Sequence, residues 1–353
     1  MNLAGRPQSE VAPVLSFLPF EYLEGENDML NAAIYGMGRW GNRLVESVQG
    51  SSKIKIVKGI SRDPAKHKEF SQKTGIKVVS SYGRVLKDPE IGAVILATPH
   101  SLHVKQIQQA AKAGKHVFDE KPMTLTRKTA EKAVEACRAA GVTLSIGFNR
   151  RHAPSFVEML YRIRSGKIGD VLHVEATHSG PTGYSLDAGS WRSTRAEAPA
   201  GGMTARGIHT LDGMIQIAGP VASVYAFSDK RKLPADIDMD DTTSMLMKFA
   251  SGATGSLSTV FVTADLYLML VFGSKGWIEM RGDTELVMRG LQGQPERITL
   301  PAVDKEKAEL EAFADAVEEK KNFVVPAEEA INGVAVLEAI EVSAKKGKPV
   351  TIK

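Results

Sequence analysis

The stretch "AAIYGMGRWGNRLVESV", residues 32–48, decides the fold that the sequence predicts. It places Gly36, Gly38 and Gly41 in G-x-G-x-x-G spacing, between a predicted strand and a predicted helix. The first glycine permits a tight turn, the second lets a pyrophosphate approach the backbone, and the third lets the helix pack closely on the strand. The helix N-terminus adds free N–H groups and a positive potential for phosphates. Glycines also mark ordinary turns, but in this strand–turn–helix context the motif predicts a dinucleotide site.

The first half of the chain continues this pattern. From residue 30 to 148 short apolar runs alternate with amphipathic segments, which is typical of a parallel sheet with helices on both faces. Helical patterns at 101–114 and 126–141 each close on a glycine, as helix C-termini often do. The runs that predict strands occupy residues 31–36, 53–59, 76–81, 93–98, 115–120 and 142–148.

The second half has longer strands and fewer helices. Met245, Met247 and Phe249 alternate with polar or small residues, the period of a sheet with one covered face. The other face has to be buried elsewhere, so we expect a homodimer or homotetramer that pairs through this sheet. The predicted strands lie at 171–179, 221–229, 242–261, 266–280 and 285–290, before helical segments at 307–320 and 327–347.

The length of 353 residues suits two domains. We expect an N-terminal extension at 1–29, a dinucleotide-binding domain at 30–149 and an α+β domain at 150–353 for substrate and oligomerisation. The last helical segments could also pack back on the first domain.

Composition argues against several classes of protein. A net charge of +4 is spread along the chain, which is weak support for nucleic-acid binding. We expect no membrane partner, because no window approaches 18 uninterrupted apolar residues. The single cysteine, Cys137, lies in a helical pattern, which predicts that it is buried as a small apolar side chain. We therefore expect no metal site and a reducing, cytoplasmic compartment.

The end of the second strand indicates which dinucleotide binds. In "KGISRDPAK", residues 58–66, the place of the acid that holds an NAD ribose falls on Ser61, and Arg62 follows. A serine can hydrogen-bond a 2′-phosphate that a carboxylate would repel, and an arginine can bind it through two hydrogen bonds. The sequence therefore favours NADP, with NAD as the alternative if Asp63 takes the ribose.

Three further stretches carry a resemblance to a known family. They read "ILATPHSLHVKQIQQAAKAGKHVFDEKP" at 95–122, "GFNRRHAPSF" at 147–156 and "GGMTARGIHTLDGM" at 201–214. With "GMGRWG", they make the chain resemble the glucose–fructose oxidoreductase and inositol dehydrogenase family, called Gfo/Idh/MocA, from about residue 30 to 352. The resemblance implies a Rossmann domain, then an open-faced, mostly antiparallel sheet with the active site between them. It also implies pyridine-nucleotide oxidoreduction of sugars, cyclic polyols or related hydroxy compounds.

The resemblance places the lysine of E-K-P, Lys121, at the active site and Glu120 near the nicotinamide ribose. The position of Lys121 in the sequence agrees with this placement, because ligands of open parallel sheets bind beyond the carboxyl ends of the strands and Lys121 follows the fifth strand. An exposed lysine at a strand end is the alternative. Hydride transfer from an alcohol also needs a proton acceptor. Lys121 must either have a lowered pKa or stay charged and stabilise the alkoxide.

His209 is the second catalytic candidate. Members of the family commonly carry an acid four residues earlier, where this chain has Ala205, and the following Arg206 cannot act as a carboxylate. Lys121 and His209 remain as the expected pair. Asp212 would orient His209 or contact substrate, with a purely structural role as the alternative.

The remaining expected contacts rest on the motif and the resemblance together. His103 could instead support its own helix, and Arg151 is a candidate to pair with a carboxylate. The expected substrate contacts are Lys121, Arg150, His209 and Asp212. The expected cofactor contacts are Gly36, Met37, Gly38, Arg39, Trp40, Gly41, Ser61, Arg62, Thr98, Pro99, His100, His103, Glu120, Lys121, Asn149, Trp191 and Arg192.

These expectations describe an NADP-dependent oxidoreductase that moves a hydride between nicotinamide and a secondary alcohol or ketone of a small-molecule sugar or cyclic polyol. A non-catalytic NAD(P)-binding regulator of the same fold is the alternative from another class, since fold does not guarantee chemistry. A third reading is an enzyme that keeps NADP bound and recycles it between two substrates.

Overall fold

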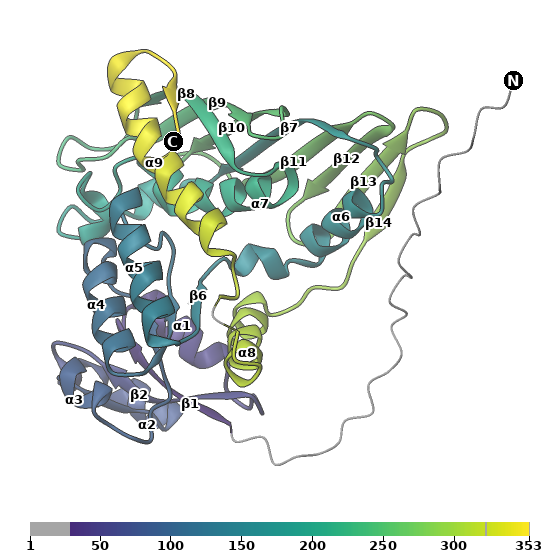
Figure 1. Ribbon diagram of the computed structural model, residues 1–353. Coiled ribbons are helices and arrows are strands. Elements are labelled where there is room, and N and C mark those ends of the chain that lie inside the picture. Colours follow the sequence, from purple (N-terminus) through teal and green to yellow (C-terminus); the bar gives the residue numbers. More distant parts are fainter. Residues whose placement is uncertain (1–28, 322, 353) are drawn as a thin grey trace, which may run out of the picture.

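The computed structural model describes residues 29–321 and 323–352 and builds them around two sheets (Figure 1). The expected extension at 1–29 lies, apart from Met29, outside the described residues. No helix of the described part is long and apolar enough to cross a membrane.

The first sheet is parallel and has six strands. Its order is β3-β2-β1-β4-β5-β6, the doubly wound order in which ligands bind where the winding reverses, between β1 and β4. All four residues of β4 are buried, as expected of a strand covered on both faces. The strands are β1 (Leu30–Tyr35), β2 (Ile54–Ile60), β3 (Lys77–Val79), β4 (Ala93–Leu96), β5 (His116–Asp119) and β6 (Leu144–Ile146).

Helices cover both faces of this sheet. One face packs against α4 (His100–Lys112) and α5 (Arg127–Ala140). The other face carries α1 (Arg39–Ser47) and also α8 (Lys305–Glu318), a helix from the far end of the chain (Figure 1). Phe313 of α8 is fully buried, with its ring centroid 5.8 Å from that of Phe118. Two short helices, α2 (Lys68–Thr74) and α3 (Tyr82–Leu86), follow β2 and β3.

The second sheet has nine strands in the order β14-β13-β12-β11-β7-β10-β9-β8-β15. All neighbours are antiparallel except β7 and β10, so the sheet is mixed, as expected. The strands are β7 (Val171–Ser179), β8 (Val221–Asp229), β9 (Thr242–Phe249), β10 (Thr254–Val260), β11 (Leu266–Gly273), β12 (Gly276–Arg281), β13 (Glu285–Gly290), β14 (Glu296–Thr299) and β15 (Val350–Thr351).

This sheet is covered on one face by α6 (Pro154–Arg164), α7 (Ile208–Ala218) and α9 (Ala327–Lys346). Met245, Met247 and Phe249 point to that face and are buried. Leu246 and Phe227 point the other way and are 61% and 60% exposed. The alternation that the sequence predicted is therefore present, and one face is free of covering helices in the described chain.

Two details differ from the predicted elements. The runs at 242–261 and 266–280 each form two strands joined by a turn, the first at Gly252, whose φ of 94° favours glycine. The strands β14 and β15 were not predicted, because "ERIT" and "VT" are too short and polar to give an alternating signal.

Candidate active site

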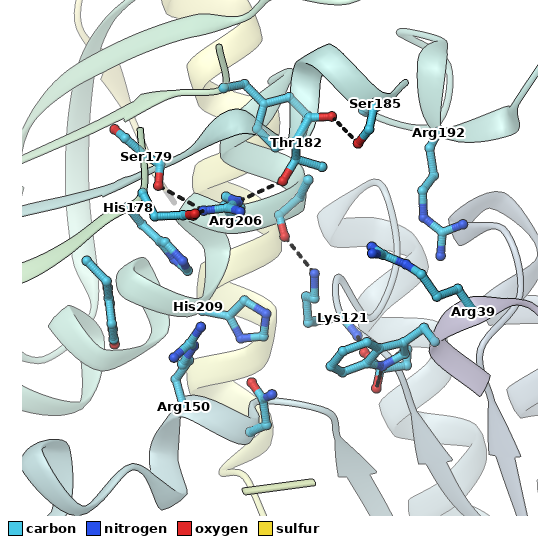
Figure 2. A pocket seen from close by; sticks show the side chains of 18 of the residues that line it. Arg39, Lys121, Arg150, His178, Ser179, Thr182, Ser185, Arg192, Arg206 and His209 are labelled. Atoms are coloured by element: carbon cyan, nitrogen blue, oxygen red, sulfur yellow. Dashed lines mark hydrogen bonds and ion pairs between the residues drawn. The ribbon is translucent and has the colours of Figure 1, made fainter. Parts of the chain in front are cut away.

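A cavity of about 1150 Å³ lies between the two sheets (Figure 2). Eleven of the predicted site residues line it, and they come from both halves of the chain: Arg39, Trp40, Thr98, His100, Glu120, Lys121, Asn149, Arg150, Trp191, Arg192 and His209.

The glycine turn stands beside this cavity, between β1 and α1. Gly36 has φ 110°, and a Cβ there would lie 2.3 Å from the Ala97 carbonyl oxygen. A Cβ on Gly41 would lie 1.9 Å from the Gly36 carbonyl oxygen, whereas one on Gly38 would meet nothing within 4 Å. Gly36 and Gly41 therefore serve close packing, and Gly38 leaves open space where a phosphate could approach. The side chain of Met37 is buried in the core, so only its backbone can face a nucleotide.

The end of β2 carries the residues predicted to choose between NADP and NAD. The Oγ atom of Ser61 lies 3.0 Å from Nε2 of His67, and Arg62 is exposed. The carboxylate of Asp63 lies 3.7 Å from the ammonium of Lys66. These residues are outside the lining of the main cavity, at the strand end where an adenosine ribose would be expected.

Lys121 follows β5 and points into the cavity (Figure 2). Its Nζ donates a 2.6 Å hydrogen bond to the carbonyl oxygen of Ala205. Burial lowers the pKa of Lys121 to about 8; the charge of Glu120 opposes this, and Arg192 and Arg150 reinforce it. The lysine can thus lose its proton near neutral pH. The Lys121-Pro122 peptide bond is cis.

Glu120 lies beside Lys121, and its carboxylate is held by two donors. The indole Nε1 of Trp40 donates to Oε1 at 2.6 Å, and the backbone N–H of Lys121 donates to Oε2 at 3.3 Å. Burial raises the pKa of Glu120 to about 7, against the opposing charge of Lys121. A Cβ at Gly147 would lie 2.8 Å from Oε1, so the glycine makes room for this carboxylate.

His103 has a different position from the one expected of a cofactor ligand. It is fully buried and does not line the cavity. Its Nε2 lies 3.0 Å from the Thr98 carbonyl oxygen, and its Nδ1 lies 3.2 Å from both the Pro122 carbonyl oxygen and the Asp119 carboxylate. Burial is the largest single effect and lowers the pKa of His103, but the charge and hydrogen bond of Asp119 together with the hydrogen bonds to Thr98 and Pro122 outweigh it, and the pKa is raised. His103 therefore ties together the ends of β4 and β5, the supporting role that the sequence left as the alternative.

His209 projects from the first turn of α7 into the cavity. Its ring centroid lies 6.3 Å from that of His178 and 6.1 Å from that of Phe148. Burial, followed by the charge of Lys121, lowers the pKa of His209 well below its usual value, so the imidazole is neutral at physiological pH. A neutral imidazole can donate or accept a hydrogen bond at a substrate hydroxyl.

Asp212 does not fit the predicted substrate contact. It lies one turn beyond His209 on α7 and outside the cavity lining. Arg151 donates to its two carboxylate oxygens at 2.8 and 2.7 Å and also reaches Glu329 at 2.6 Å. The carboxylate is thus satisfied by a buried ion pair, and Arg151 has the carboxylate partner that the sequence suggested.

The remaining predicted residues frame the cavity. His100 packs edge-on against Trp191, with ring centroids 4.9 Å apart, and the Arg192 guanidinium lies 4.1 Å from the Trp191 ring centroid. The Asn149 Nδ2 donates to Glu306 of α8 at 2.7 Å. Pro99 is the residue before α4 and does not line the cavity.

Several cavity residues were not among the predicted contacts, and three of them have large polar side chains that could bind a substrate, namely His178 of β7, Arg206 and Tyr267 of β11. Arg206 lies in a short π-helix, Met203–Gly207, that runs into α7. Arg206 falls within the motif at 201–214, but nothing in that motif marked it as a contact, and no motif surrounds His178 or Tyr267. Only the register of β7 with β11, which sets His178 opposite Tyr267, brings two of them together.

Comparisons with known proteins agree with this geometry. Residues 30–148 match the model of an oxidoreductase family with an NAD-binding Rossmann fold, and residues 156–279 match the GFO/IDH/MocA C-terminal domain. The chain belongs to the Gfo/Idh/MocA family. It is an NAD(P)-dependent oxidoreductase of that family, as the sequence predicted.

Relatives of this family match most of the chain. An uncharacterised oxidoreductase, YrbE, of Bacillus subtilis is 30% identical over 250 residues, which are 69% of this chain and 71% of the relative. D-xylose 1-dehydrogenase (NADP(+)) 2 of Haloferax volcanii is 27% identical over 83% of this chain and 90% of its own length. The structure of aldose-aldose oxidoreductase from Caulobacter crescentus, complexed with glycerol, matches with a TM-score of 0.83 and 26% identity, over 92% of this chain and 100% of that one.

Proposed function

We propose that this protein is an NADP-dependent dehydrogenase or reductase that moves a hydride between nicotinamide and a secondary alcohol or ketone of a sugar-like or cyclic polyol substrate. The observation that carries the proposal is that a buried lysine of lowered pKa and a neutral histidine line the same cavity, at the carboxyl ends of the Rossmann-sheet strands. The xylose dehydrogenase among its relatives supports this substrate class.

A bound nicotinamide would accept or supply the hydride in this mechanism, and side chains of the protein would accept or supply the proton. Neutral Lys121 accepts the alcohol proton as the hydride leaves, and the Ala205 carbonyl holds its Nζ in place. His209 hydrogen-bonds the reacting oxygen and keeps it directed at Lys121. Arg39 and the N-terminus of α1 would hold the pyrophosphate, and Trp40, Glu120, Trp191 and Arg192 would enclose the nicotinamide ribose.

The preference for NADP rests on the end of β2. Ser61 has a hydroxyl at the position where a carboxylate would repel the 2′-phosphate of NADP. The guanidinium of Arg62 is exposed and can move to bind that phosphate. The carboxylate of Asp63 pairs with the ammonium of Lys66, so it is not an unpaired acid directed at a ribose.

A panel of sugars, inositols and related diols with NADP⁺ and NAD⁺, followed at the nicotinamide absorbance, tests the function. Turnover of at least one cyclic polyol or sugar, faster with NADP⁺, is expected. Tight nucleotide binding without turnover of any hydroxy compound would contradict the catalytic proposal.

We also propose a homodimer or homotetramer that pairs through the uncovered face of the second sheet. Phe227 and Leu246 protrude from that face, and large apolar side chains that gather on one surface mark interaction sites. Light scattering of Leu246→Lys should show a smaller particle than the unchanged protein. Tyr161→Ser, at an equally exposed aromatic on α6, should keep the parent mass. An unchanged mass for Leu246→Lys would overturn this assembly.

A further inference from the structure

The part of the cavity farthest from the nucleotide side is bordered by cations. Figure 2 places Arg150, His178 and Arg206 on the opposite side of Lys121 from Arg39 and Arg192. The charges that act most strongly on the neutral His209 and His178 are all positive, from Lys121, Arg150 and Arg206. The two imidazoles at the substrate end are therefore surrounded chiefly by cationic side chains.

Arg206 is held in place but keeps free donor groups. Its Nη1 donates to the Ser179 carbonyl oxygen at 2.8 Å and to Asp265 at 2.9 Å, and its Nε donates to Thr182 Oγ1 at 3.1 Å. Its Nη2 has no hydrogen-bond partner among the described residues. Asp265 offsets the charge of Arg206 only weakly, because the Asp265 side chain is 72% exposed and its charge is screened by water.

The fold makes room for this guanidinium. A Cβ built on Gly180 would lie 2.1 Å from Nη1 of Arg206. The backbone of Gly180 has φ 165°, an extended conformation that any residue can adopt. A side chain at this place would therefore displace the Arg206 guanidinium and the Asp265 carboxylate beside it, and the glycine leaves room for both.

Arg150 is the second cation with donor groups to spare. Its Nη1 donates to Asp283, and the guanidinium lies 4.9 Å from the centroid of the Tyr267 ring. Asp283 also pairs with Lys305, so one carboxylate faces two cations. Lys121 has no carboxylate within ion-pair distance in the described chain; its nearest acidic neighbour, Glu120, has a pKa raised to about 7 by burial. The carboxylates of Asp265, Asp283 and Glu285 also line the cavity, so what distinguishes the substrate end is two guanidinium groups that each keep unused N–H donors.

From these unused donors we infer that the substrate is a polyhydroxy carboxylate, whose carboxylate binds between Arg150 and Arg206 while its reacting hydroxyl lies at Lys121 and His209. Planar guanidinium groups with unused N–H donors match a carboxylate in shape and charge. The inference deepens the proposed function and rests on it, because it assigns the substrate class of the same site.

Binding to the protein–NADP⁺ complex, measured by calorimetry, tests the inference separately from catalysis. The ligands are D-glucuronate, its methyl ester, D-glucose and D-glucose 6-phosphate. We expect D-glucuronate to bind at least about tenfold more tightly than the ester and D-glucose, since a hydrogen bond to a charged group commonly contributes that factor or more. Equal affinity for the acid and its ester would overturn the inference, and tighter binding of the phosphate would overturn the carboxylate assignment.

Two variants locate the effect at Arg206. Arg206→Gln should weaken D-glucuronate binding about 10- to 100-fold and change D-glucose binding about twofold or less. Gly180→Ala, which keeps every charge but displaces the guanidinium, should weaken D-glucuronate selectively as well. Arg281→Gln removes a positive charge at the rim, where Arg281 pairs with Glu279, and should keep the parent preference. An equal loss for acid and neutral ligands in Arg206→Gln would contradict the inference.

Turnover of the same ligands separates the two proposals. Selective binding of D-glucuronate without oxidation of any ligand would count against the proposed function and for the carboxylate subsite. Oxidation of neutral sugars with no preference for acids would support the function and overturn the subsite.

Discussion

The two sheets of this protein bury their side chains differently, and the difference decides where function is found. The parallel sheet is covered on both faces, so its central strand β4 is apolar and buried throughout, and the functional groups lie in the turns that follow β1, β2, β4 and β5. The mixed sheet is covered on one face, and it contributes side chains from the strands themselves, such as His178 and Tyr267. The nucleotide side is thus built from local turns, and the substrate side from strand register.

The largest expected effect separates chemistry from nucleotide binding at Lys121. Lys121→Met should lower kcat about 10²- to 10⁴-fold, because it removes the proton acceptor. The dissociation constant of NADPH, from fluorescence titration, should change only a few-fold, since the glycine turn is untouched. Undiminished turnover would remove Lys121 from the mechanism.

Two substitutions of phenylalanine compare the covered parallel sheet with the uncovered face of the mixed sheet. Phe313→Ala should lower the free energy of unfolding by about 3–5 kcal/mol, because Phe313 is fully buried between α8 and the parallel sheet. Phe227→Ala, at a side chain 60% exposed, should change it by about 0.5 kcal/mol or less in dilute solution. Urea denaturation measures both. Equal losses of unfolding free energy in the two variants, at low protein concentration, would mean that the second sheet has no uncovered face.

The turn after β2 should set the choice of cofactor. Arg62→Ala should weaken NADPH binding about tenfold or more and leave NADH nearly unchanged, because only NADPH carries the 2′-phosphate that a guanidinium can hold. Arg84→Ala, on α3, serves as a control for loss of a surface charge. Equal affinity of the unchanged protein for NADPH and NADH would sink the argument from Ser61 and Arg62.

The smallest effect is a pH dependence. With alcohol as substrate, kcat/KM should rise about tenfold per pH unit up to about pH 8 and then level off, because Lys121 must be neutral to accept a proton and burial lowers its pKa to about 8. In Glu120→Gln the midpoint should move to lower pH, since the charge of Glu120 raises the pKa of Lys121. A midpoint that moves upward, or a flat profile, would assign the ionisation elsewhere.

The parallel sheet and its turns could be predicted because each depends on residues close in sequence. Gly36, Gly38 and Gly41 fall within one turn, and Lys121 follows its own strand directly. The role of His103 was harder to predict from the sequence. A histidine is expected at this position whether it forms a buried ion pair with Asp119 or contacts a ligand, so the residue type and spacing do not distinguish the two roles.

Part of the substrate side was beyond prediction. Arg206 is placed by a π-helix that has no recognised signature, and its surroundings depend on Gly180 and Asp265, both far away in the chain. Asp212 was misplaced for a related reason: its partner Arg151 follows the sixth strand, and only the packing of α7 against that segment brings the two together.

The position of α8 has a consequence for how the protein is made. A ribosome releases residues 30–149 long before Lys305–Glu318 exist, so the parallel sheet emerges with one face missing Leu310 and Phe313. Until then Phe118 and Ile34 have only part of their packing partners. The nucleotide-binding half is therefore completed by a segment synthesised long after it, and nascent chains cut short before residue 305 should remain clients of chaperones.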